Sequence, residues 1–206
     1  MTVRDDFLDT AAAAVRLLED AAVAERWDDP SALEGMTVGA LAAHLAHQIF
    51  LVPRLLDAGG AENAEPVSLI DHYSGPEWDD ADVHAALRRS SAEAAEQGAR
   101  TLAERAAATL ADLRGRLPSE PADRVVPLPW AQPLTLDDLL TTRMTELVVH
   151  SDDLAVSVDK EAAPPPAAVE TVIGLLARLS ARRHGPTAVL RALSRAERAP
   201  ASISAF

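Results

Sequence analysis

The sequence predicts an all-α protein: a four-helix bundle with one or two additional C-terminal helices. Apolar residues recur at threes, fours and sevens through several long segments, which is the spacing of one face of a helix. The 206-residue chain is rich in alanine and contains only three Phe, three Trp and one Tyr. That composition favours closely packed helices over a sheet sandwich. A chain of this length is expected to form one domain, residues 1–206, in which about 185–206 is a C-terminal extension.

The individual helices follow from periodicity and from their end signals. Thr37 and Thr135 are expected N-caps, and Pro53 is expected to kink the second helix or split off its last turns. The segment 61–80 is irregular, and a loop of that length in a compact domain is expected to cover a site. A second loop is expected at 118–133. The six helices are expected at about 3–27, 38–58, 81–117, 135–158, 167–184 and 188–198.

Charge and composition exclude several classes of function. The formal net charge is −13 and the sequence pI is near 4.8, so the basic footprint of a nucleic-acid-binding protein is missing and no attraction to anionic membranes is expected. There are no cysteines, so any thiol chemistry must use a thiol from outside the chain. Neither a run of about 18 apolar residues nor a signal-peptide pattern is present, which predicts a cytoplasmic protein. Homodimer formation is left open.

The fourth predicted helix carries a glutamate and a histidine four residues apart, Glu146 and His150. This spacing stacks the two side chains on one side of a helix, at the margin of its apolar stripe. One interpretation is a surface contact worth a few tenths of a kcal/mol. The other is a pair of ligands for a divalent metal, which would need a third ligand from another helix.

The second predicted helix offers that third ligand. His44 lies at the margin of its apolar stripe, whereas His47 points nearly the opposite way and is expected at the surface. A histidine at the edge of a core is often only structural. Three such residues at core margins of two helices favour a metal site, because helical bundles build metal sites from inward-facing side chains.

Four further residues are weaker candidates. Asp153 is either an outer-shell hydrogen-bond partner of a ligand imidazole or a solvated carboxylate. Arg143 either anchors an anionic group or pairs with a nearby carboxylate, and we favour the pairing. His72 and Tyr73 either reach the site, to hold a substrate or donate a proton, or are ordinary surface loop residues.

The sequence resembles a known family in two motifs. TVGALAAHLAH, which contains His44, and RMTELVVHSDDLA, which contains Glu146, His150 and Asp153, are similar to the DinB-like metal-binding four-helix bundles. Within these, the chain is most similar to the group of the mycothiol-dependent maleylpyruvate isomerase N-terminal domain. The C-terminal segment RLSARRHGPTAVLRALSRAERAP is also similar to that group.

The resemblance implies a metal site and a thiol cofactor. It implies that His44, Glu146 and His150 bind a divalent metal, usually zinc, and that the metal activates the thiol of mycothiol toward an electrophile. Nickel, iron and manganese suit the same ligands, since sequence does not define the geometry. The isomerase proper has a second domain that contributes to its site. We expect that domain to be absent here.

Three hypotheses follow, and the last of them is a purely structural helical domain in which His44, Glu146 and His150 bind nothing. The first is a metal-dependent, mycothiol-linked transferase or isomerase, in which the metal activates the external thiol for attack on a small electrophilic substrate. Three protein ligands leave a fourth position open, as catalytic zinc sites do. The second is a non-catalytic metal-binding bundle with a stress-response or interaction role. Whether the protein is an enzyme is not decided by the sequence.

Overall fold

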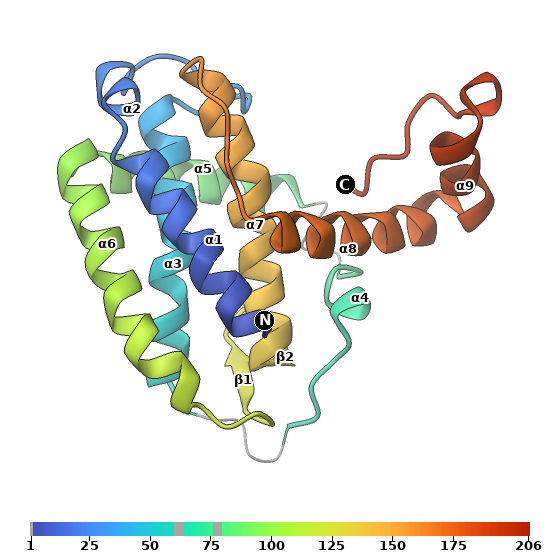
Figure 1. Cartoon of the computed structure of the whole chain (residues 1–206), viewed down its shortest axis with the longest axis horizontal. Helices are drawn as coiled ribbons and strands as arrows, with labels where there is room; N and C mark the ends of the chain where they lie inside the picture. Colours follow the sequence, from blue (N-terminus) through green and yellow to red (C-terminus); the bar gives the residue numbers. More distant parts are fainter. Residues whose placement is uncertain (1, 60–63, 76–79) are drawn as a thin grey trace.

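The computed structural model describes residues 2–59, 64–75 and 80–206. Nearly all of the regular structure in these residues is helical, with one small antiparallel hairpin (Figure 1). The all-α prediction is therefore confirmed. The elements in chain order are α1 (Val3–Leu18), α2 (Ala21–Glu25), α3 (Val38–Asp57), α4 (Leu69–His72), α5 (Ala81–Ala95), α6 (Ala99–Arg116), β1 (Val125–Leu128), β2 (Ala131–Thr135), α7 (Leu136–Ser157), α8 (Pro166–His184) and α9 (Pro186–Ser194), with short 3₁₀ turns at Leu117–Ser119 and Ala196–Arg198.

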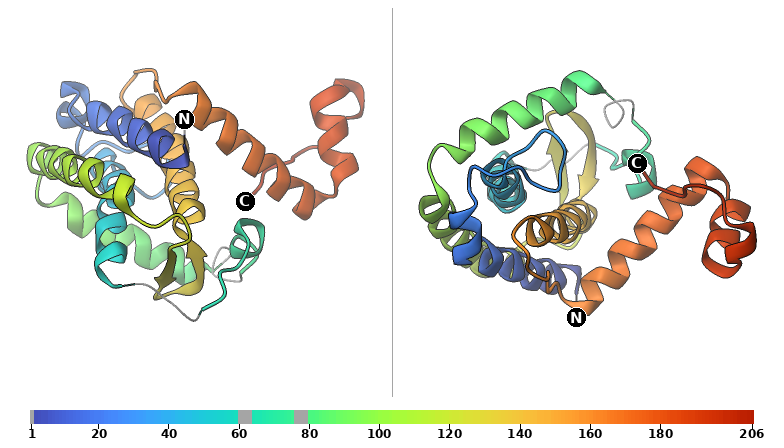
Figure 2. Two further views of the ribbon diagram at one scale, coloured as in Figure 1. Left: turned by 60° about the horizontal axis from the view of Figure 1, so that its bottom comes forward. Right: turned by 90° about the horizontal axis from the view of Figure 1, so that it is seen from above.

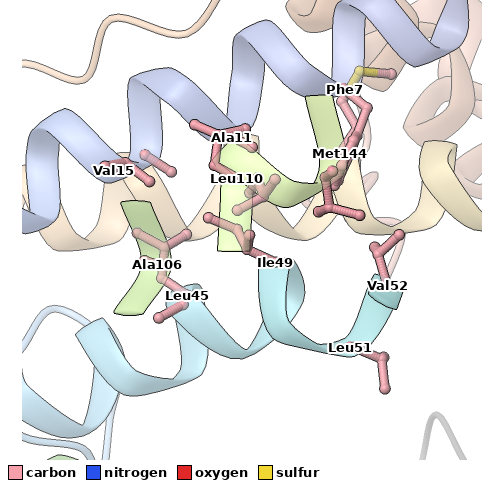
Figure 3. Close-up of a cluster of buried hydrophobic side chains, with 14 of the residues drawn as sticks. Phe7, Ala11, Val15, Leu45, Ile49, Leu51, Val52, Ala106, Leu110 and Met144 are labelled. Atoms are coloured by element: carbon pink, nitrogen blue, oxygen red, sulfur yellow. The ribbon is translucent and has the colours of Figure 1, made fainter. Parts of the chain in front are cut away.

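The core lies between α1, α3, α6 and α7, and α5 packs along α3. In the right view of Figure 2, α3 and α7 are seen nearly end on, and α8 leads away from the bundle toward α9. Figure 3 shows side chains from all four core helices meeting, among them Phe7, Leu45, Leu110 and Met144. Burying a side chain of this size stabilises the fold by roughly 1.5–3 kcal/mol. This packing fixes the position of α3 relative to α7.

Helix α3 is the innermost helix of the bundle. Among the described residues, it is the one helix long and apolar enough to cross a membrane, but 78% of its most apolar window is buried inside the protein. Such burial is typical of a core helix. The helix runs through Pro53 to Asp57 without a split, which was one of the two outcomes expected at that proline, and its cap is the predicted Thr37, whose hydroxyl accepts the N–H of Ala40.

Two of the predicted helices are broken in the structure. The predicted helix 3–27 ends at Leu18, and Asp20 caps a separate α2 by accepting the N–H of Ala22. The predicted helix 81–117 is interrupted at Gly98, whose φ of 81° is in the left-handed region that ends helices. Both breaks turn the chain so that the following helix can pack on the bundle.

The two predicted loops contain short ordered elements. Within 118–133, the chain forms the β1–β2 hairpin, in which Val125 pairs with Thr135. Within 61–80, residues 61–63 and 76–79 lie outside the described part, and the remainder contains the four-residue helix α4. The loop is tied to the hairpin by a hydrogen bond from the N–H of Val67 to the carbonyl of Pro133. The hairpin leads directly into the predicted N-cap Thr135, whose hydroxyl accepts the N–H of Asp138 at 3.1 Å.

The first turn of α3 depends on a glycine. A Cβ on Gly39 would lie 2.6 Å from the indole ring of Trp27, so any larger residue must displace the tryptophan. We expect Gly39→Ala to lower the free energy of unfolding by about 1–3 kcal/mol, the usual cost of overpacking. The control is Gly174→Ala in α8, where nothing lies within 4 Å of the added Cβ. That variant should be about 0.5–1 kcal/mol more stable. Urea unfolding of both variants tests this, and equal effects would contradict it.

Candidate metal centre

The structure brings His44 of α3 together with Glu146 and His150 of α7. The Nε2 atoms of both histidines lie 3.4 Å from the same oxygen, Oε2 of Glu146. The two imidazole rings meet edge to face, with centroids 4.7 Å apart and an interplanar angle of 77°. His44 is buried, whereas the Glu146 and His150 side chains are 22% and 16% exposed. The cluster thus lies at the edge of the core and is open on its α7 side.

The spacing of the three ligand atoms suits a divalent metal. One ligand atom from each residue lies within 4.8 Å of the others. Donors bonded at about 2.0–2.1 Å to a tetrahedral ion lie about 3.3 Å from one another, and the two His–Glu distances are 3.4 Å. Two imidazoles and a carboxylate suit zinc and equally iron, nickel or manganese. The residues therefore fit a metal without selecting which one.

Asp153 lies one turn after His150 and contacts its outer ring nitrogen. Its Oδ2 is 2.9 Å from His150 Nδ1. A carboxylate at that position accepts the Nδ1–H proton, so that in the neutral imidazole the Nε2 lone pair faces Glu146. His44 has no such partner, because its Nδ1 is buried without a hydrogen bond among the described residues. The outer shell is therefore built on the α7 side of the cluster.

Without a metal, the cluster is held together by charge. Burial by itself raises the pKa of the Glu146 carboxyl, but hydrogen bonds from His150 and His44, together with the positive charges of His150 and Arg143, hold that pKa well below its usual range. Burial likewise lowers the pKa of His150, but hydrogen bonds to Asp153 and Glu146 and their negative charges raise it to about 9. The metal-free form is thus an imidazolium–carboxylate pair at neutral pH.

This pairing predicts that metal binding releases a proton. Coordination needs a neutral imidazole, so below pH 9 the ion must displace the proton on His150 Nε2. We expect release of about one proton per metal at pH 7.5 and an affinity that rises roughly tenfold per pH unit up to about 9. Calorimetric titration in buffers of different ionisation enthalpy measures the proton count. Release of no proton would contradict the assigned charge state.

The raised pKa of His150 also affects the folding stability of the metal-free protein, which should fall as the pH rises, whereas the metal affinity should increase. Because the pKa of His150 is raised from 6.5 in the folded protein, its protonation stabilises the fold below pH 6.5, and that stabilisation is lost as the pH rises through about 9. The melting temperature of the metal-free protein should therefore fall between pH 7 and 9.5. A His150→Ala variant should show a smaller fall. Equal falls would show that other groups cause it.

Gln48 and Arg143 form a buried link between α3 and α7 beside the cluster. Arg143 Nη1 donates to Gln48 Oε1 at 2.6 Å, and Arg143 Nε donates to Thr142 Oγ1 at 3.1 Å. The Gln48 amide donates to the carbonyl of His44 at 3.1 Å and lies 3.4 Å from His44 Nε2. The direct partners of Arg143 are thus neutral groups rather than the carboxylate that the sequence led us to expect. Its charge acts on Glu146 from one turn away.

His72 and Tyr73 are buried, so the interpretation of both as surface loop residues is wrong. They end α4, their rings are 5.3 Å apart, and the Tyr73 ring lies 5.6 Å from that of Phe206 at the C-terminus. Burial and the nearby carboxylate of Glu146 raise the pKa of the Tyr73 phenol, and a hydrogen bond with Thr145 opposes that rise. Tyr73 therefore reaches the neighbourhood of the cluster from a distant part of the chain.

Two residues near the site, Gln48 and Phe206, were not predicted from the sequence. Gln48 follows His44 by four residues, the same spacing that joins Glu146 to His150, and this was the one signal that could have found it. Phe206 offered no signal, since the tail that carries it has no periodicity. His47, expected at the surface, is half-buried and contacts neither Glu146 nor His150 through any described ion pair.

The fold and the cluster define a class: a helical bundle of the DinB-like type that carries a His–Glu–His cluster between two of its core helices. Residues 7–155 match the family model described as the mycothiol maleylpyruvate isomerase N-terminal domain. The chain belongs to this family, as the resemblance of its two motifs predicted. No curated protein matches the chain in sequence.

A solved structure agrees with this assignment at the level of the fold. The crystal structure of the mycothiol-dependent maleylpyruvate isomerase is similar with a TM-score of 0.57 and 19% sequence identity. The similarity covers 87% of this chain and 70% of that chain. The DinB-like fold prediction is confirmed.

Proposed function

We propose that the chain is a metal-dependent, mycothiol-linked transferase or isomerase, with His44, Glu146 and His150 as the ligands of a divalent metal, zinc first among them. The observation that carries this proposal is the convergence of two imidazole nitrogens on one carboxylate oxygen, each at 3.4 Å. Membership of a family described by its mycothiol dependence supports the choice of thiol.

The chain itself supplies no thiol, which agrees with an external one. Three protein ligands leave a position open for a further donor, the arrangement of catalytic rather than structural zinc sites. A bound divalent ion supplies one thing here: it lowers the pKa of a coordinated thiol so that the reactive thiolate exists at neutral pH. The remaining tasks fall to the residues of the chain.

Those residues orient and neutralise the site. Asp153 holds His150 in the tautomer whose Nε2 faces the cluster. Glu146 contributes the one full negative charge among the three ligands, and Arg143 balances it from the protein side. Tyr73, with its hydroxyl near Thr145, is our candidate for contacting the substrate or donating a proton to it. His72 packs behind Tyr73 and is the weaker candidate.

The experiment is a thiol-consumption assay with an uncharged electrophile such as 1-chloro-2,4-dinitrobenzene. The thiol sulfur bonds to the ring carbon, chloride leaves with the electron pair of its bond, and the thiol proton passes to solvent. Zinc-loaded protein should accelerate the reaction of mycothiol with a range of such electrophiles, and His44→Ala should not. A protein that binds metal but accelerates none of them would support the non-catalytic metal-binding bundle instead.

A further inference from the structure

A pocket of about 510 Å³ begins at the open side of the metal cluster. Glu146 and His150 form one end of it, and its walls come from α7, α8, α9 and the C-terminal tail. In Figure 1 the α8–α9 arm projects from the bundle and the tail returns beside it toward the bundle. A volume between 300 and 1,000 Å³ is usual for small-molecule sites. The pocket therefore joins the candidate metal centre to a ligand-sized space.

Nine of the fourteen described lining residues have apolar side chains, including Val149, Leu176 and Leu193. Neither an arginine nor a lysine is among the lining residues that the structure describes, and Glu146 is the acidic residue among them. The Ser180 hydroxyl, also in the lining, already donates to the carbonyl of Ile203 at 2.7 Å. In the metal-free protein the imidazolium of His150 also lines the pocket, but it is already paired with the carboxylates of Glu146 and Asp153. Among the described lining residues, an anionic ligand would thus find no unpaired cationic side chain to offset its loss of hydration.

The tail that closes the pocket is anchored to α8. Besides the Ser180–Ile203 bond, His184 Nε2 lies 2.7 Å from the carbonyl oxygen of Ser204. The ring of the terminal Phe206 packs on that of Tyr73, directly after α4. The tail is therefore held by α8 at Ile203 and Ser204 and by Tyr73 at Phe206.

We propose that this pocket binds the alkyl or aryl group of an uncharged electrophile and presents its reactive carbon to the cluster. The identity of the ligand as an electrophile rests on the proposed function, whereas the preference for uncharged apolar groups rests on the pocket alone. A divalent ion, a thiolate, the carboxylates of Glu146 and Asp153 and the guanidinium of Arg143 together carry no net charge, so the loaded cluster does not restore an attraction for anions. A dicarboxylate such as maleylpyruvate does not suit this lining.

The test uses an uncharged fluorescent probe, N-phenyl-1-naphthylamine, and a matched pair of variants on α9. Leu193 lines the pocket and Leu190 does not, yet both are largely exposed, at 72% and 66%. Zinc-loaded wild-type protein should bind the probe saturably. Leu193→Glu should weaken binding at least about tenfold, because it places a carboxylate in the apolar lining. Leu190→Glu should change it less than about twofold.

A competition arm tests the preference for neutral ligands. In metal-free protein, where no ion can coordinate a carboxylate, octanamide should displace the probe at a concentration at least about tenfold lower than octanoate. This arm needs neither metal nor thiol, so it can succeed where the thiol-consumption assay fails, and the reverse.

Three results would overturn the proposal: no saturable binding by wild-type protein, equal weakening by both α9 variants, or displacement by octanoate as good as by octanamide. Sedimentation of the same samples adds a fourth. If wild-type protein is a dimer that Leu193→Glu dissociates, a second copy of the chain covers this face and it is not a substrate pocket.

Discussion

His44→Ala is expected to abolish tight metal binding, with a loss of affinity above about 100-fold. The variant removes one of the three proposed ligands and leaves Glu146 and His150, two donors on one turn of α7. Losing an outer-shell partner costs roughly 10–100-fold in metal affinity, so losing a ligand should exceed that range. Asp153→Ala, which removes only the partner of His150, should fall within it. Competition with a chromophoric chelator measures all of these affinities.

The control for this series is His47→Ala. His47 is on the same helix as His44, three residues later, and burial lowers its pKa, so its imidazole is neutral at pH 7 and free to bind a metal. His47→Ala should therefore keep the metal affinity of the wild-type protein. A loss of affinity comparable to that of His44→Ala would contradict the assigned ligands. Melting curves of the metal-free variants separate loss of a ligand from loss of the fold.

The second large effect is expected in the pH dependence of thiol reactivity. A free thiol with a pKa near 8.5 is only about 3% thiolate at pH 7. If the zinc-loaded protein supplies mycothiol as its thiolate, ionisation alone should raise the rate at pH 7 by about 30-fold. The rate should also change little between pH 6.5 and 8. The reaction of mycothiol with an uncharged electrophile, followed across that range, measures both quantities.

The matching variant is His150→Ala. In its presence, the rate of the mycothiol reaction should rise about tenfold per pH unit, as for the free thiol. A zinc-loaded wild-type protein with that same slope would contradict thiol activation by the site. The slope is informative because a purely structural metal would leave it unchanged.

Much of the site could be anticipated because it depends on helical periodicity. The i, i+4 spacing of Glu146 and His150 is a local property, and the cap at Thr135 sets the start of their helix. His44 could be chosen over His47 because the apolar stripe of its helix shows which side faces the core. These arguments need no knowledge of how the helices are arranged, beyond their packing in a bundle.

The features that could not be predicted depend on tertiary packing, or their sequence signals are hidden by neighbouring residues. Pro127, Pro129 and Pro133 conceal the β1–β2 hairpin, since proline argues against a strand. The break at Gly98 had a signal, a glycine where a helix could end, but the alanine-rich sequence on both sides outweighed it. The approach of Tyr73 to the site has no sequence signal at all.

The role of the tail is the clearest case of this limit. Residues 199–206 form no helix or strand, and they are held beside α8 by hydrogen bonds with three of its side chains, Ser180, Arg183 and His184. Without the structure, Phe206 is only the last residue of an irregular segment. With it, the tail becomes one wall of a pocket that ends at Glu146 and His150.

Cobalt substitution tests the central claim most directly, because it reports both the ligands and the open position. Co²⁺-loaded protein should show the visible absorption of a low-coordinate site with nitrogen and oxygen donors. On addition of mycothiol, an intense near-ultraviolet band from sulfur to cobalt should appear, with saturation at one thiol per metal. The band should be absent in His44→Ala. Cobalt binding without any thiol-dependent band would contradict thiol activation, and failure to bind cobalt would contradict the metal centre itself.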